Sequence, residues 1–142
     1  MGVAENKALV RRLYESLNKG KAAHMAVVDE LCATEGAYHT GTGREFRSLA
    51  DCKQQVGELF DAFPDLHITI DDMIGEGDKI VTRWTVTGTH TGKLHGITAT
   101  NKKITLWEIS IDRIVDGKFV EEWERFDTLG YMQQLDLIPK TP

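Results

Sequence analysis

The spacing of hydrophobic residues changes at Pro64, from the period of a helix to that of a strand, and that change constrains the fold more than any other feature. Before it, apolar residues recur every three to four positions, as in Leu9, Leu13 and Leu17, which is the period of an amphipathic helix. After it, apolar and polar residues alternate, first over residues 66–71, which is the period of a strand. Helices followed by an antiparallel meander are typical of an α+β fold.

Finer signals place the elements. Ser48 and Asp51 have the spacing of a capping box at a helix start, and Asp116-Gly117 is a hairpin turn signal. We predict helices at residues 6–17, 22–31, 49–63 and 128–135, a brief strand at 36–40, and longer strands at 66–71, 80–89, 104–114 and 119–125. The helices must cover one face of the sheet. If the sheet is curved, helices packed on its concave face enclose a cavity.

Composition excludes several classes of protein. The 142 residues, 41% of them hydrophobic, suffice for one domain over residues 1–142 with its own core. The formal net charge is −5 without any basic cluster, so we expect no nucleic-acid partner. No apolar leader or membrane-length segment occurs, so we expect a cytoplasmic protein without membrane contact. Two cysteines, Cys32 and Cys52, form neither a disulfide framework nor a metal motif.

The last predicted strand carries the most distinctive pattern, because carboxylates follow one another in the segment 117–127. Two interpretations of Glu124 are open. In the first, its carboxylate is exposed to solvent. In the second, its side chain faces a cavity, where burial would raise the pKa of the carboxyl group and suit it to proton transfer. Strict alternation divides the strand into two sets, Val120, Glu122 and Glu124 on one face and Phe119, Glu121 and Trp123 on the other.

The strand at 104–114 has a glutamate, Glu108, at its centre. Alternation puts Glu108 on one face with Ser110 and Asp112, and such a residue needs solvent on an outer face, a partner or a function. Arg83, at the centre of the strand at 80–89, is equally ambiguous, and we interpret it first as the partner of a strand carboxylate.

Three histidines, His39, His90 and His95, lie where they could converge at the mouth of a cavity, whereas His24 and His67 lie on predicted polar faces. The histidines have no zinc spacing, and nucleotide-binding or Ser/His/Asp motifs are missing from the sequence, so we predict no metal site.

From Phe63 onward the sequence resembles the SnoaL-like polyketide cyclase family, also called ester cyclases. The matching elements occur in the family's order, and that order is more specific than any single element. They are Phe-Pro-Asp at 63–65, Gly-Asp-Lys at 77–79, Arg-Trp at 83–84, Gly-Thr-His-Thr-Gly at 88–92, Arg-Ile-Val-Asp-Gly-Lys at 113–118, and Trp, Asp, Gly and Gln-Leu between 123 and 135.

The resemblance implies a cone-shaped α+β fold like that of nuclear transport factor 2, with a curved antiparallel sheet and N-terminal helices around a pocket. It implies that Glu124 is the general acid/base of an intramolecular aldol closure, that His90 assists, and that neither metal nor cofactor is used. It also implies a homodimer or higher homo-oligomer. We expect six further residues to line the pocket, namely His39, Arg83, Trp84, Glu108, Ser110 and Asp127.

Three departures from the family pattern bear on activity. Ser110 stands where the cyclases carry a histidine, Glu124 stands where the acid is usually aspartate, and the loop at 96–101 lacks two prolines. We therefore carry two hypotheses. The first is a cofactor-independent enzyme acting on a small apolar or aromatic carbonyl substrate, with Glu124 as acid/base. The second is a non-catalytic ligand-binding or adaptor domain of the same fold, which the serine favours.

Overall fold

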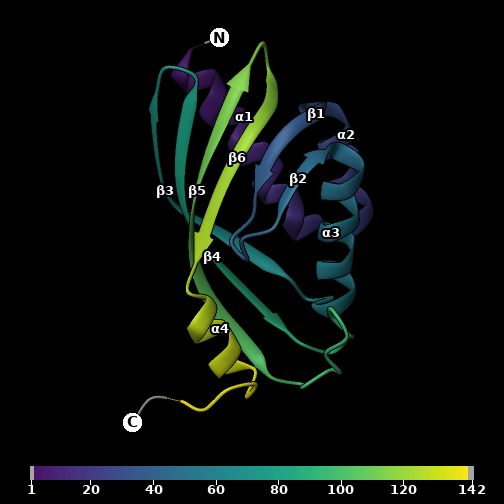
Figure 1. Ribbon diagram of the computed structural model, residues 1–142. Coiled ribbons are helices and arrows are strands. Elements are labelled where there is room, and N and C mark those ends of the chain that lie inside the picture. The colour runs from purple at the N-terminus through teal and green to yellow at the C-terminus, as the bar shows by residue number, and fades with distance from the viewer. Residues whose placement is uncertain (1, 141–142) are drawn as a thin grey trace.

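A computed structural model describes residues 2–140. Figure 1 shows a strongly curved sheet with helices against one side of it. In chain order the elements are α1 (Val3–Glu15), a 3-10 helix (Ser16–Lys19), α2 (Lys21–Leu31), β1 (Cys32–His39), β2 (Glu45–Ser48), α3 (Leu49–Ala62), β3 (His67–Glu76), β4 (Lys79–Thr89), β5 (Lys103–Val115), β6 (Lys118–Phe126) and α4 (Thr128–Gln134).

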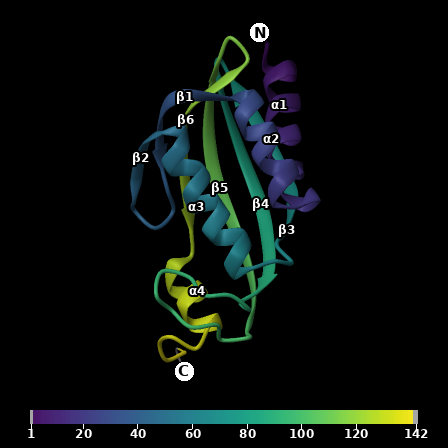
Figure 2. The same cartoon turned by 90° about the vertical axis from the view of Figure 1, so that its right-hand side faces the viewer.

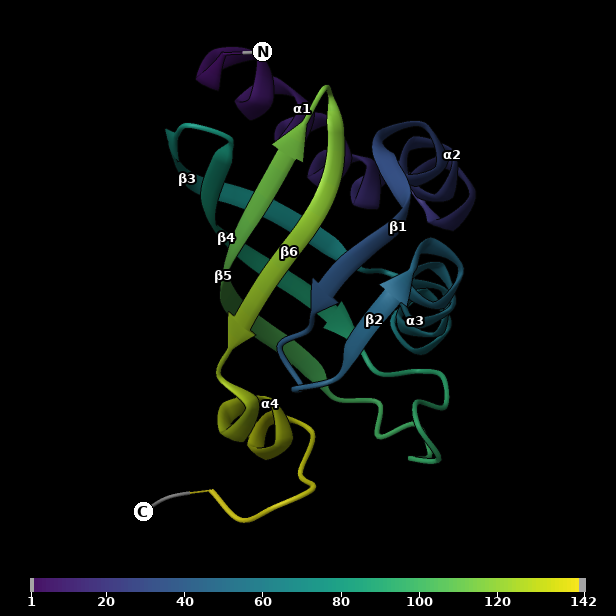
Figure 3. The same cartoon turned by 45° about the horizontal axis from the view of Figure 1, so that its top comes forward.

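One sheet holds all six of these strands, in the order β2-β1-β6-β5-β4-β3. The four long strands form the expected antiparallel meander. The pairing of β1 with β6 is parallel, so the sheet is mixed rather than wholly antiparallel. Figure 3 shows β1 alongside β6, with β2 beyond it at the edge near α3.

The helices cover the concave face of the sheet, as Figure 2 shows for α2 and α3 in front of β4 and β5. The stripe expected on α1 is buried through Val10, Leu13 and Tyr14. Ser48 caps α3 by accepting a hydrogen bond from the Asp51 backbone N–H at 3.2 Å, as the capping signal predicts. Within residues 2–140, no helix combines the length and apolar character needed to cross a bilayer.

The Asp116-Gly117 turn forms as predicted, with φ of 49° and 77° at its two residues. Beyond the turn, the pairing register of β5 with β6 shifts by one residue, because Ile114 opposes Phe119 and Arg113 opposes Glu121. Val120 is thus an extra residue in β6, a β-bulge. Strict alternation was wrong here, because the bulge puts Phe119 on the same face as Glu122 and Glu124.

Candidate functional site

A cavity lies between the concave sheet face and the helices, and it has two adjoining compartments. The loop-side compartment, of about 190 Å³, is bounded by the loop at residues 90–102, by α3 and by Tyr131 of α4. The helix-side compartment, of about 130 Å³, is bounded by α1, α2 and β1. Five residues line both, namely Leu17, Val56, Leu59, Trp84 and Glu124.

Glu124 is, among the described residues, the one titratable side chain that borders both compartments. Its position follows from the hairpin, since β6 pairs with β5 so that Glu124 opposes Ser110. Burial raises the pKa of Glu124 to about 8, the neighbouring Glu122 adds to the rise, and a hydrogen bond from the Gly41 backbone N–H opposes it. A carboxyl group with this pKa can both accept and return a proton near neutral pH.

Gly41 reaches Glu124 because it has no side chain. A Cβ atom at this position would lie 2.4 Å from the ring of Phe126 and 3.2 Å from Oε1 of Glu124. The absence of a side chain thus lets the backbone approach the carboxyl group closely.

The inner face of β5 is polar at its centre, where Glu108, Ser110 and Asp112 are all buried. The outer face carries Trp107 and Ile109, which are 61% and 41% exposed. Of the alternatives open for Glu108, solvation on an outer face is therefore excluded, and its expected place in the pocket lining is observed. Burial raises the pKa of Glu108 well above its usual range, and the charges of Glu124 and Glu122 add to the rise.

A hydrogen-bonded chain runs across the floor of the helix-side compartment. Trp84 Nε1 donates to Ser110 Oγ at 3.2 Å, and the Ser110 and Tyr14 hydroxyl groups lie 2.6 Å apart. The Tyr14 hydroxyl donates to Asp112 Oδ2 at 2.6 Å. Because Tyr14 has a single proton and gives it to Asp112, Ser110 must donate to Tyr14.

Two more acids flank this chain. Burial raises the pKa of Asp112 to about 6, although its hydrogen bonds with Glu122 and with Tyr14 act in the opposite direction. Burial and the charge of Asp112 together raise the pKa of Glu122 well above its usual range. Within this pair, burial therefore disfavours two negative charges at once.

The three histidines do not converge. His39 lies beside Glu121 (Nε2 to Oε2, 2.9 Å) and stacks on Trp123 at 5.5 Å. His90 is 1% exposed and stacks on Phe63, behind the residues that line the cavity. Only His95 borders the loop-side compartment among the three.

The residues expected to line the pocket divide into two groups. Trp84 and Glu108 border the loop-side compartment, and Ser110 lies beneath Trp84. Arg83 is on the outer face of β4, half-exposed, with NH1 3.9 Å from Asp71, because alternation along β4 turns Trp84 inward instead.

Asp127, the remaining residue expected in the pocket, caps α4 by accepting from the Gly130 backbone N–H at 2.8 Å. It is not among the lining residues of either compartment.

Sequence reasoning missed Tyr14, Asp112 and Glu122 as site residues. Strand alternation put Glu122 on the same face as Glu124, but no role was assigned to it. Sequence reasoning also took His24 as solvated, whereas His24 is 6% exposed, borders the helix-side compartment and bonds Ser16 Oγ through Nδ1 at 2.7 Å.

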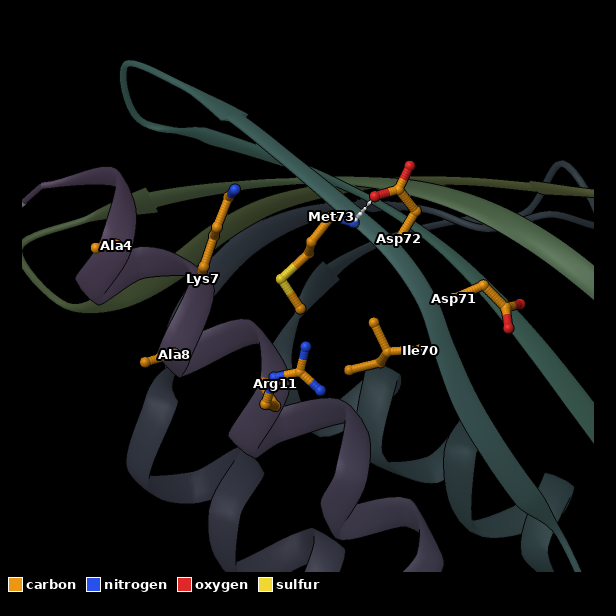
Figure 4. Close-up of a pocket in the computed structure, with 8 residues that line it drawn as sticks. All are labelled: Ala4, Lys7, Ala8, Arg11, Ile70, Asp71, Asp72 and Met73. Carbon is orange, nitrogen blue, oxygen red and sulfur yellow. Dashed lines mark hydrogen bonds between the residues drawn. The ribbon is translucent and has the colours of Figure 1, made fainter.

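A second depression lies on the surface between α1 and β3. Figure 4 shows its lining, in which Lys7 and Arg11 of α1 face β3, the strand that carries Asp71 and Asp72. It is open to solvent and of mixed charge. The enclosed cavity is therefore the stronger candidate site.

Metal ligands are not grouped in the part of the chain that the structure describes: no cluster of three or more His, Cys, Asp or Glu side chains is arranged to hold an ion.

Comparison with known families agrees with the geometry. A family model for SnoaL-like polyketide cyclases matches residues 7–135. The chain belongs to this family. Among curated proteins, no significant match to this SnoaL-like chain is found.

Solved structures share the fold of this SnoaL-like chain over nearly its whole length. AclR of Streptomyces galilaeus, a candidate hydroxylase, is 26% identical, with a TM-score of 0.86 over 99% of this chain and 87% of AclR. TsrD of Streptomyces laurentii is 28% identical, with a TM-score of 0.81 over 97% and 99%. IdmH of Streptomyces antibioticus, a candidate polyketide cyclase, is 25% identical, with a TM-score of 0.79 over 93% and 99%.

Proposed function

We propose that this protein is a small-molecule enzyme of the polyketide cyclase type, in which Glu124 is the general acid/base for aldol-type ring closure or closely related carbonyl chemistry. The observation that carries the proposal is the position of Glu124, a carboxyl group with a raised pKa on the wall shared by two mostly apolar compartments. Membership of the SnoaL-like family and the likeness to IdmH support it.

The chemistry suits a carboxyl group of this kind. A carbon next to a carbonyl group is acidic enough for the Glu124 carboxylate to take its proton, which leaves an enolate. The enolate carbon then attacks a second carbonyl group of the same substrate, and protonated Glu124 returns its proton to the new alkoxide. The cavity contributes by excluding water and by holding the two reacting carbons in contact.

The cavity volumes indicate the size of the substrate. The compartments of about 190 and 130 Å³ are individually below the ~300–1,000 Å³ usual for small-molecule sites, and together they reach its lower end. We infer a compact aromatic or apolar carbonyl compound, with one or two rings in the loop-side compartment between Trp84 and Phe126.

Replacement of Glu124 by glutamine tests the assignment. We expect Glu124→Gln to keep the fold and to lower turnover by about 10²–10⁴-fold, because the amide has similar shape but cannot accept the proton. Proton exchange at the α-carbon of β-tetralone, a bicyclic aromatic ketone, can be followed in D2O by NMR. The wild-type rate should rise with pH through about 8, as the Glu124 carboxyl ionises.

Glu121→Gln is the matched control, because Glu121 is on the same strand and interacts with His39 and Arg113 instead of the cavity. It should exchange at the wild-type rate. If Glu124→Gln also does so, Glu124 is not the base.

A non-catalytic ligand-binding or adaptor role is the second candidate, and Ser110 favours it. A family histidine at this position would offer a titratable ring, whereas the Ser110 hydroxyl is fully occupied by Tyr14 and Trp84. Native mass spectrometry of protein from its own host would favour this role if a small apolar ligand is retained and no carbonyl compound is consumed.

A further inference from the structure

Glu108 has no structural reason to be a glutamate. It is 6% exposed at the centre of β5, between Leu106 and Ser110 on the inner face, and its Oε2 atom has no hydrogen-bond partner among the described residues. Trp84 on β4 and Phe126 on β6 are its cross-strand neighbours. Leucine would fit this environment without the cost of burying a carboxyl group.

Glu108 borders the same compartment as Glu124. Glu124 opposes Ser110 and Phe126 opposes Glu108, so the two glutamates are diagonal neighbours on the cavity face of β5 and β6. Diagonal pairs have Cα atoms about 7–8 Å apart, which leaves room for a small molecule to touch both side chains.

No cation balances this pair within the loop-side compartment. The other titratable side chains that border it, from all the described elements around it, are His95 of the loop at 90–102 and Tyr131 of α4. His95 is directed toward Glu58, with Nδ1 3.8 Å from Oε2. Two carboxyl groups in one apolar space without a counter-ion do not both ionise at neutral pH.

The two carboxyl groups have different surroundings, which decides which one ionises. Glu124 receives a hydrogen bond from the Gly41 backbone N–H and has Arg125 as a neighbour, and both favour its anion. Glu108 receives no comparable contact from the described residues. Glu124 is therefore the carboxylate and Glu108 the carboxylic acid when one charge is present.

We propose that Glu108 is a second catalytic residue, a protonated carboxyl group that donates a hydrogen bond to the substrate carbonyl oxygen while Glu124 removes a proton from the adjacent carbon. This inference rests on the proposed function and adds an acid to its base. It assigns the unpartnered Oε2 atom of Glu108 to the substrate.

Every proton that moves in the proposed ring closure is accounted for. The C–H bond breaks and its proton goes to Glu124, while the electron pair forms an enol whose oxygen takes the Glu108 proton. The enol carbon attacks the second carbonyl carbon, and the Glu124 proton passes to the oxygen of the new hydroxyl group. As the enol returns to a ketone, its O–H proton goes back to Glu108. Both side chains end as they began, and no oxidant or reductant is consumed.

The protonation state is tested by NMR on protein labelled with 13C at the glutamate carboxyl carbons. The Glu108 resonance is assigned by its loss in Glu108→Gln. We expect it at the position of a protonated carboxyl group at pH 7, and we expect its midpoint to fall in Glu124→Gln, which removes the neighbouring charge. An ionised Glu108 at pH 7 would overturn the proposal.

The catalytic role is tested with Glu108→Leu and Glu108→Gln in the β-tetralone exchange assay. Glu108→Leu should lose about 10²–10³-fold in kcat, as for removal of one hydrogen-bond donor to a developing oxyanion. Glu108→Gln should lose less, because its amide N–H still donates. A merely structural glutamate would not show this order, since leucine fits among Leu106, Trp84 and Phe126 and should leave the melting temperature unchanged or higher.

The outcomes separate this inference from the proposed function. If Glu124→Gln loses exchange while Glu108→Leu retains the wild-type rate, Glu108 is not catalytic and the function of Glu124 stands. If Glu124→Gln retains the wild-type rate, the proposed function fails, and this inference fails with it.

Discussion

Tyr14 connects the first helix to the floor of the cavity through one hydroxyl group. It accepts from Ser110 and donates to Asp112, and its ring meets Trp84 edge-on at 5.4 Å. Because Asp112 is completely buried, its negative charge depends on hydrogen bonds, which come from Glu122 and from Tyr14. A single residue of α1 thus contributes to the stability of the charged form of a buried acid on β5.

Tyr14→Phe should destabilise the protein in a pH-dependent way. The Tyr14 hydrogen bond holds the pKa of Asp112 below the value that burial alone would give, so its contribution is present above that pKa and is lost as pH falls through it. We expect a loss of about 1–3 kcal/mol in unfolding free energy at pH 8 and a smaller loss at pH 5. Urea unfolding at both pH values measures it.

Tyr38→Phe is the control for this change, because the Tyr38 hydroxyl makes one long hydrogen bond, 3.4 Å to the Ala33 carbonyl. It should cost less and show little dependence on pH. An equal loss in Tyr14→Phe at pH 5 and pH 8 would contradict the assigned role.

For single residues, the sequence predicts which side chains are unusual better than it predicts which face of a strand they occupy. It marked Glu108 and Glu124 as unusual, because a carboxylate within a strand needs an explanation. It could not tell which face of β5 is inner, because Trp107 and Ile109 make the outer face as apolar as the inner one. The sequence also could not name the ion-pair partner of Arg83, because that partner, Asp71, lies on a neighbouring strand.

Among elements, the loop at residues 90–102 is held in place by the buried side chain of His90. Its Nδ1 accepts from the Thr100 backbone N–H at 3.2 Å and lies 3.0 Å from Thr100 Oγ1. The Asn101 backbone N–H also donates to the His90 carbonyl at 2.8 Å. Because Leu94 and His95 of this loop border the loop-side compartment, His90 positions one wall of the cavity from behind.

We therefore predict that His90→Ala loosens this loop. Loss of the contacts to Thr100 should cost about 1–2 kcal/mol of local stability, and amide hydrogen exchange of residues 93–101 should accelerate while the β4–β5 strands stay protected. His67→Ala is the control, because His67 is exposed at the start of β3. Unchanged exchange in the loop would show that His90 does not anchor it.

The elements themselves were largely predictable, with two informative exceptions. Long periodic segments such as α1 and α3 form where the pattern places them. The strand β2 was missed, because its four residues are too few and too polar to show a period. The bulge at Val120 was missed because it depends on pairing with β5, a non-local contact that alternation within β6 cannot reveal.

Over the whole molecule, the outer face of the sheet is unusually apolar. Ile74, Val81, Ile111 and Trp123 form a cross-strand row from β3 to β6, and the exposed Ile109 and Trp107 extend the apolar surface along β5. Exposed apolar surface of this kind is typical of an interface. We propose, as the family resemblance implies, that a second copy of the chain covers it in a homodimer.

Trp107→Glu should then shift the protein from dimer to monomer in sedimentation equilibrium, because it would bury an unpaired charge at the interface. Leu129→Glu is the control, since Leu129 is similarly exposed, at 56%, but belongs to α4 rather than to a strand of the sheet. A wild-type protein that sediments as a monomer would refute the dimer. The fold could be expected from the order of helices and strands, whereas an interface requires knowledge of which apolar residues remain outside.

The bulge at Val120 also has a consequence for how this chain can change over evolutionary time. Carboxylates occur on both faces of β6, so the hairpin register selects which of them are offered to a ligand. A slip of one residue would withdraw Glu122 and Glu124 and would fill the cavity with Trp123 and Arg125 instead. Insertions or deletions near the Asp116-Gly117 turn would therefore change which side chains face the cavity, and not only the length of the turn. We expect this short turn to tolerate less variation in length than its surface position suggests.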